Sequence, residues 1–138
     1  MGSIPIGSTR IKMTKSKQTI IDELTQEVIA FRDERNWEQY QNPKDLALGL
    51  LIEAGELAEY FHYLQGSELR KYTKTFKKEI GEELSDVLYW MLLMAHDLDI
   101  DLVKEFRQKM QKNAKKYPPK DGVGKAFNRL AKKRAAAK

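Results

Sequence analysis

Two apolar stretches, each interrupted by acids at regular spacing, constrain the fold of this chain most. The first is LALGLLIEAGELAEYFHYL at residues 46–64, and the second is EIGEELSDVLYWMLLMAHD at residues 79–97. Apolar residues recur at three- and four-residue intervals in both stretches, which predicts two amphipathic helices that pack against other helices. The acids of interest do not lie opposite the apolar stripes but on one flank of each, and they are Glu53, Glu56, Glu83 and Asp86.

The rest of the chain predicts further helices and no strand. Thr19-x-x-Asp22 is a capping-box pattern ahead of a helical repeat, and Pro43 suits the first turn of the next helix. Residues 68–78 carry five bases and are expected to form an exposed loop or a helix start. Because no segment alternates with period two for long, we expect an all-α fold, a four-helix bundle or part of one. Its helices are predicted at about 19–35, 43–64, 75–98 and 102–116.

Charge divides the chain into three parts. The full chain carries a net charge of +5, but residues 19–119 hold 14 bases and 19 acids. Residues 1–18 hold four bases and no acid, and residues 120–138 hold seven bases and one acid. We therefore expect an acidic helical domain over 19–119, a disordered N-terminal segment over 1–18 and a basic C-terminal tail over 120–138. The tails are expected to be solvated, and the alternative is an oligomeric binding module whose tails contact nucleic acid.

Several classes of protein are excluded by what the sequence lacks. There is no cysteine, which excludes disulfides and thiolate chemistry and favours an intracellular, cytoplasmic protein. No apolar run approaches the roughly 18 residues that a membrane span requires. The N-terminus also lacks the apolar core of a signal peptide.

The four flanking acids predict a metal site. Each helix presents a pair at positions i and i+3, a spacing that places both on one face. Four carboxylates brought together would repel one another, and their pKa values would rise unless a divalent cation kept them ionised. Oxygen ligands suit Mg²⁺ or Mn²⁺, and Mg²⁺ usually completes its shell with water and substrate phosphates. The alternative is that lysines and arginines of neighbouring helices pair with these acids.

A carboxylate-bridged di-iron bundle is the rival metal site, and it requires Glu-x-x-His on two helices. Glu59-x-x-His62 matches this pattern, but it projects to the other side of the helix from the acid pair. His96 has Leu93 rather than a glutamate three residues before it. We interpret both histidines as ordinary surface or interface residues.

At these residues the sequence resembles the MazG-like, all-α nucleoside triphosphate pyrophosphohydrolases, and most of all the branch that includes dCTP pyrophosphatase. The mark of that family is Glu-x-x-Glu on one helix and Glu-x-x-Asp on the next. Here the two motifs are Glu53-Ala-Gly-Glu56 and Glu83-Leu-Ser-Asp86, and the exit Asn113-x-x-Lys116-Tyr117-Pro118 follows them. The resemblance extends from about residue 31 to about residue 118.

The resemblance implies a Mg²⁺-dependent hydrolase that converts dNTPs, among them dCTP and non-standard nucleotides, to dNMP and pyrophosphate as house-cleaning of the nucleotide pool. It implies that the four acids hold the metal and carry the catalysis. It also implies a homodimer or homotetramer whose pocket is completed by a neighbouring subunit. Tyr63 replaces a tryptophan of that branch, so the preferred nucleobase stays open, and Trp37 is alternatively a lid on the core. The implied substrate-binding residues are Trp37, Tyr63, Trp90, Lys109, Asn113, Lys116 and Tyr117.

Overall fold

The computed structural model describes residues 17–119, 132–133 and 135–137, and these residues form helices and turns without any β-strand. The prediction of an all-α fold is confirmed for them. Of the N-terminal segment predicted to be disordered, residues 1–16 lie outside the described residues. Of the predicted basic tail, only residues 132–133 and 135–137 are described. The elements, in chain order, are α1 (Ile20–Asp33), the 3-10 helix η1 (Glu38–Tyr40), α2 (Pro43–Glu59), α3 (Gly66–Thr75), α4 (Lys77–Asp97) and α5 (Leu102–Lys116).

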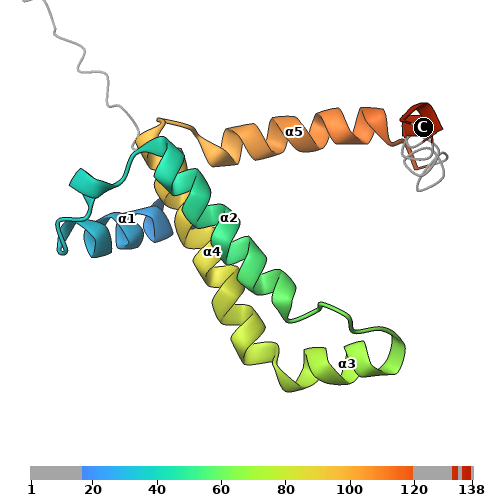
Figure 1. Ribbon diagram of the computed structural model, residues 1–138. Helices are drawn as coiled ribbons and strands as arrows, with labels where there is room; N and C mark the ends of the chain where they lie inside the picture. Colours follow the sequence, from blue (N-terminus) through green and yellow to red (C-terminus); the bar gives the residue numbers. More distant parts are fainter. Residues whose placement is uncertain (1–16, 120–131, 134, 138) are drawn as a thin grey trace, which may run out of the picture.

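The antiparallel pair of α2 and α4 forms the centre of the molecule (Figure 1). Leu46 of α2 and Leu92 and Leu93 of α4 are almost completely buried. Each such leucine contributes about 2 kcal/mol to folding by the removal of its side chain from water. Helix α2 begins at Pro43, as predicted, and the Asn42 side chain caps it by accepting a hydrogen bond from the backbone N–H of Asp45 at 3.0 Å.

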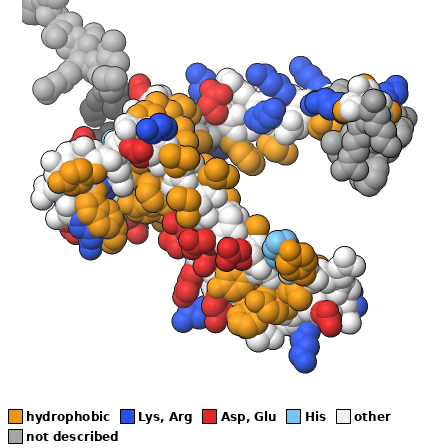
Figure 2. Space-filling model, in the orientation of Figure 1, with side chains coloured by type: hydrophobic (Ala, Val, Ile, Leu, Met, Phe, Trp, Pro, Cys, Tyr) orange, Lys and Arg blue, Asp and Glu red, His pale blue; other side chains and the backbone are white. Residues whose placement is uncertain are grey.

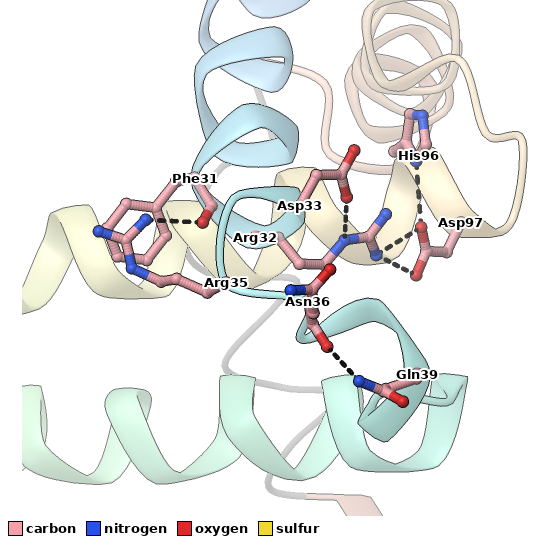
Figure 3. A network of polar contacts seen from close by, with 8 residues as sticks. All are labelled: Phe31, Arg32, Asp33, Arg35, Asn36, Gln39, His96 and Asp97. Carbon is pink, nitrogen blue, oxygen red and sulfur yellow. Dashed lines mark hydrogen bonds and ion pairs between the residues drawn. The ribbon is translucent and has the colours of Figure 1, made fainter.

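An ion pair between a buried arginine and a partly exposed aspartate attaches α1 to the end of α4 (Figure 3). Arg32 is only 2% exposed, and its Nη1 donates to both carboxylate oxygens of Asp97, at 2.9 and 2.8 Å. Burial opposes the charge of Arg32, but the hydrogen bond and the charge of Asp97 raise its pKa. Burial likewise opposes ionisation of Asp97, whose pKa is nevertheless lowered by hydrogen bonds with His96 and Arg32. Both groups are therefore held in their charged forms.

The region between α2 and α4 differs from the prediction. α2 ends at Glu59 rather than near residue 64, and the chain then turns through Tyr63, whose φ is 64°. Most of residues 68–78, expected as a loop or a helix start, belongs to the separate helix α3. The rings of Tyr72 and Phe76 lie 4.3 Å apart, and that of Tyr60 lies 6.5 and 6.1 Å from them. This aromatic contact holds α3 beside the ends of α2 and α4. The predicted count of four helices is corrected to five α-helices within residues 17–119.

Helix α5 extends away from the other helices and ends far from α3 (Figure 1). Its hydrophobic side chains lie along the lower side in Figure 2, and its lysines and arginines lie along the upper side. Phe106 and Met110 are 66% and 50% exposed in the single chain. The described residues of one chain therefore do not close the predicted four-helix bundle. None of the described helices has the length and hydropathy needed to cross a membrane.

Candidate metal centre

Three of the four predicted carboxylates meet where α2 faces α4. An oxygen of Glu53, one of Glu56 and one of Glu83 all lie within 4.8 Å of one another. Two of these acids come from neighbouring turns of α2 and the third from α4, so the packing of the two central helices sets their separation. Glu53 and Glu83 are half-buried, whereas Glu56 is exposed. Figure 2 shows acidic side chains gathered on this face, between α5 and α3.

The charges of this cluster are not balanced within the described chain. Partial burial raises the pKa of Glu83, and the negative charges of Glu56, Asp86 and Glu53 raise it further. Within residues 17–119, no lysine or arginine forms an ion pair with any of the four acids. The alternative in which basic side chains of this chain neutralise the cluster therefore finds no support in the described residues.

Asp86 lies one turn after Glu83 on α4 and is exposed. It is outside the group of three carboxylates, but it is close enough for its charge to raise the pKa of Glu83. Its place as a fourth ligand stays a prediction. The donor set consists of carboxylate oxygens on two packed helices, and it fits a hard divalent cation such as Mg²⁺ or Mn²⁺.

Trp90 is joined to the cluster by a hydrogen bond. Its indole Nε1 donates to Oε1 of Glu53 at 3.3 Å. A Cβ added at Gly49, one turn before Glu53 on α2, would lie only 2.6–2.7 Å from three carbons of the indole ring. The ring therefore lies directly against the backbone of α2. The sequence did not indicate this contact.

A pocket of 430 Å³ opens beside the cluster and is lined by Glu56, Glu59, Tyr60, Tyr72 and Glu83. Partial burial raises the pKa of the Tyr60 hydroxyl, and the charge of Glu83 adds to this effect. Tyr60 lies one turn beyond Glu56, a spacing that could have identified it. Tyr72 could not be found in this way because it lies on α3, in the segment expected as a loop or helix start.

Of the seven predicted substrate-binding residues, Trp90 contacts the cluster through Glu53, and the other six are not gathered around it in the described chain. Trp37 precedes η1, packs edge-on against Phe31 at 5.7 Å and is 42% exposed. Tyr63 lies between α2 and α3, stacks on His62 at 3.8 Å and is 90% exposed. The remaining four, on α5 and at its C-terminal end, project away with that helix (Figure 1), and they are Lys109, Asn113, Lys116 and Tyr117. Their role in binding a substrate stays a prediction.

Comparison with known proteins identifies the family of this chain. The model of the MazG-like family matches residues 50–130, more than half of the chain. The chain is 37% identical over 90 residues to dCTP pyrophosphatase 1 of Rattus norvegicus, and this match covers 64% of this chain and 53% of that protein. The match to dCTP pyrophosphatase 1 of Homo sapiens has the same identity and coverage. The protein of that name from Bos taurus is 31% identical over 105 residues, or 75% of this chain and 62% of the relative.

A solved structure supports the same relationship. The crystal structure of a pyrophosphatase from Archaeoglobus fulgidus superimposes with a TM-score of 0.70 and 34% sequence identity. That match covers 76% of this chain and 98% of the archaeal one. By contrast, the chain spans only about half to three fifths of the length of the curated relatives that it matches.

Proposed function

Because this chain belongs to the MazG-like family, we propose that it is a divalent-metal-dependent nucleoside triphosphate pyrophosphohydrolase. The observation that supports this most is the group formed by Glu53, Glu56 and Glu83, whose oxygens lie within 4.8 Å of one another and have no basic partner among the described residues. Such a group is costly to maintain unless it binds a cation. The names of the matched relatives indicate the same chemistry.

In the proposed mechanism, Glu53, Glu56 and Glu83 would hold Mg²⁺ or Mn²⁺, and Asp86 would complete the set. Bound there, the cation would supply Lewis-acid stabilisation of charge on the triphosphate oxygens. One carboxylate of the group accepts a proton from a water molecule that attacks a phosphorus atom in line. The bond between the α- and β-phosphates breaks, and the products are a nucleoside monophosphate and pyrophosphate.

The proposed substrates are dNTPs, including dCTP, and the cellular role is the removal of unwanted nucleotides. Trp37, whose ring remains partly exposed, and Trp90 would contact the base and sugar. The residues of α5 would reach a nucleotide across an oligomer interface, because α5 projects away from the cluster of its own chain. The proposal therefore includes a homodimer or homotetramer.

The test is a panel of dNTPs incubated with the protein and Mg²⁺, with the products identified. Pyrophosphate and a monophosphate are expected, and Glu53→Gln or Asp86→Asn should abolish their release. Glu27→Gln, which removes an exposed carboxylate from α1, is the matched control and should leave the rate unchanged. Release of inorganic phosphate alone, or no cleavage of any triphosphate, would contradict the proposal.

A further inference from the structure

Trp90 packs against Gly49 and donates a hydrogen bond to Glu53, an arrangement that the family resemblance did not indicate. We infer that Trp90, seated against Gly49, is a positioning residue that fixes the carboxylate of Glu53 for metal binding. This inference rests on the proposed function only in that the cation is the one proposed there. It assigns to Trp90 a second task beside the proposed contact with the base or sugar.

The hydrogen bond between Trp90 and Glu53 is the first observation. The indole N–H can only donate, and its Nε1 lies 3.3 Å from Oε1 of Glu53. A donor on one carboxylate oxygen restricts rotation of the group and leaves the other oxygen available to a cation. Hydrogen bonds of this kind to ligating carboxylates orient them, and their loss usually weakens metal binding by about 10- to 100-fold.

The second step is the seat of the indole ring. A Cβ at position 49 would lie 2.6 Å from Cδ2 and Cε3 of Trp90 and 2.7 Å from Cε2, and real Cβ atoms do not approach so closely. Gly49 is buried in the middle of α2, where glycine is less favourable than alanine. The space that Gly49 leaves is the space that the indole ring occupies. Gly55 on the same helix differs, because nothing lies within 4 Å of the Cβ that it would carry.

The third step is that Trp90 is engaged on several sides. One face of the ring lies on Gly49, the N–H is directed to Glu53, and Tyr89 lies edge-on at 5.5 Å. The face against Gly49 is closed to a nucleobase. The geometry thus couples the position of a metal ligand to the packing of an aromatic ring across the α2–α4 interface.

The test is calorimetric titration of the full-length, metal-free protein with Mn²⁺ alone, without nucleotide. Trp90→Phe, which removes the N–H, and Gly49→Ala, which displaces the ring, should each weaken Mn²⁺ binding by about tenfold. Gly55→Ala is the matched control and should bind Mn²⁺ as the wild type does. Together, Trp90→Phe and Gly49→Ala should weaken binding no further than either alone, because both break the same contact. Unchanged Mn²⁺ affinity in Trp90→Phe would overturn the inference.

A second measurement does not depend on metal binding or on the folding of a Gly49 variant. In a ¹H–¹⁵N spectrum of the metal-free protein, the indole signal of Trp90, assigned with Trp37→Phe, should move in Glu53→Gln and stay in place in Glu56→Gln. An unchanged position of the Trp90 indole signal in Glu53→Gln would overturn the inference. If the wild type binds Mn²⁺ and releases pyrophosphate, and the Trp90 and Gly49 variants bind Mn²⁺ equally well, the inference is wrong and the proposed function stands. If the variants bind Mn²⁺ more weakly but the wild type cleaves no triphosphate, the proposed function is wrong and the inference stands.

Discussion

At the scale of single residues, the raised pKa of Glu83 shows that grouping the acids lowers the stability of the metal-free fold. Its carboxyl group is half-buried and lies near three other acids of the cluster, and its pKa is raised by burial and then by these charges. In the metal-free protein a proton is therefore bound more tightly by the folded state than by the unfolded one. This residue consequently lowers the stability of the metal-free fold at neutral pH.

We predict that Glu83→Gln raises the melting temperature of the metal-free protein at pH 7.5. The wild type loses stability as pH rises from the ordinary glutamate pKa of about 4.3 through the raised pKa of the folded state, and the variant does not. The difference in melting temperature should therefore disappear near pH 4. Differential scanning calorimetry in EDTA measures both values, and Glu27→Gln, an exposed carboxylate on α1, serves as the control.

Addition of Mg²⁺ should reverse this order. A ligand that binds only the folded state raises the melting temperature, and the wild type retains all its proposed ligands whereas Glu83→Gln lacks one. The wild type should become the more stable of the two in excess Mg²⁺ at pH 7.5. Equal Mg²⁺-induced shifts in the two proteins would show that Glu83 does not bind the cation.

At the scale of helices, α1 is held to α4 by a charged contact as well as by apolar packing. Arg32 is buried in the described structure, and Asp97 at the end of α4 receives both of its Nη1 hydrogen bonds (Figure 3). The carbonyl of Arg32 also accepts the backbone N–H of Trp37 at 3.2 Å, so the connection to η1 depends on the same residue. Buried ion pairs of this kind become costly when one partner is removed.

We predict that Asp97→Asn lowers the free energy of unfolding by about 3 kcal/mol, because it removes the closer of the two carboxylates paired with the buried guanidinium of Arg32 and leaves only the more exposed Asp33. Glu82→Gln is the control, since it breaks the Lys78–Glu82 pair, whose side chains are 86% and 64% exposed. That change should cost no more than about 0.5 kcal/mol. Urea denaturation followed by circular dichroism compares the two, and equal effects would contradict the role given to Arg32.

At the scale of the whole molecule, the single chain leaves apolar surface that its own helices do not cover. Phe106 and Met110 of α5 are half or more exposed, and so are Leu51 and Ile52 of α2, at 67% and 58%. Surface of this kind is typical of a face that packs against another subunit. The acidic face also lies in the bend between α5 and α3 (Figure 2), where a second copy would bring its own side chains to the cluster.

We predict that Phe106→Glu prevents self-association and abolishes pyrophosphate release, because a charge cannot be buried in the proposed interface. Light scattering after size exclusion should then give the protomer mass of 16.0 kDa, with the helical circular dichroism signal retained. Gln108→Glu introduces the same charge on the opposite side of α5 and should remain oligomeric and active. A wild-type protein that is itself monomeric would contradict the oligomer proposal.

The sequence by itself determined the features that depend on neighbours along the chain. The capping box of Thr19 and Asp22 and the start of α2 after Asn42 were predictable because their hydrogen bonds span three residues. The acids at i and i+3 in α2 and in α4 were predictable as pairs for the same reason. Their assignment to a metal site came from the chemistry of carboxylates and from the family resemblance.

Only the tertiary structure decided which of these groups meet. It places Glu83 with the two acids of α2 and leaves Asp86 outside the group of three, and it seats Trp90 on Gly49. It also ends α2 at Glu59 and brings Tyr60, which follows α2, against Phe76, which lies between α3 and α4. These outcomes depend on how close two helices approach and on their register, which are set by packing between residues far apart in the chain and not by the local periodicity that a sequence displays.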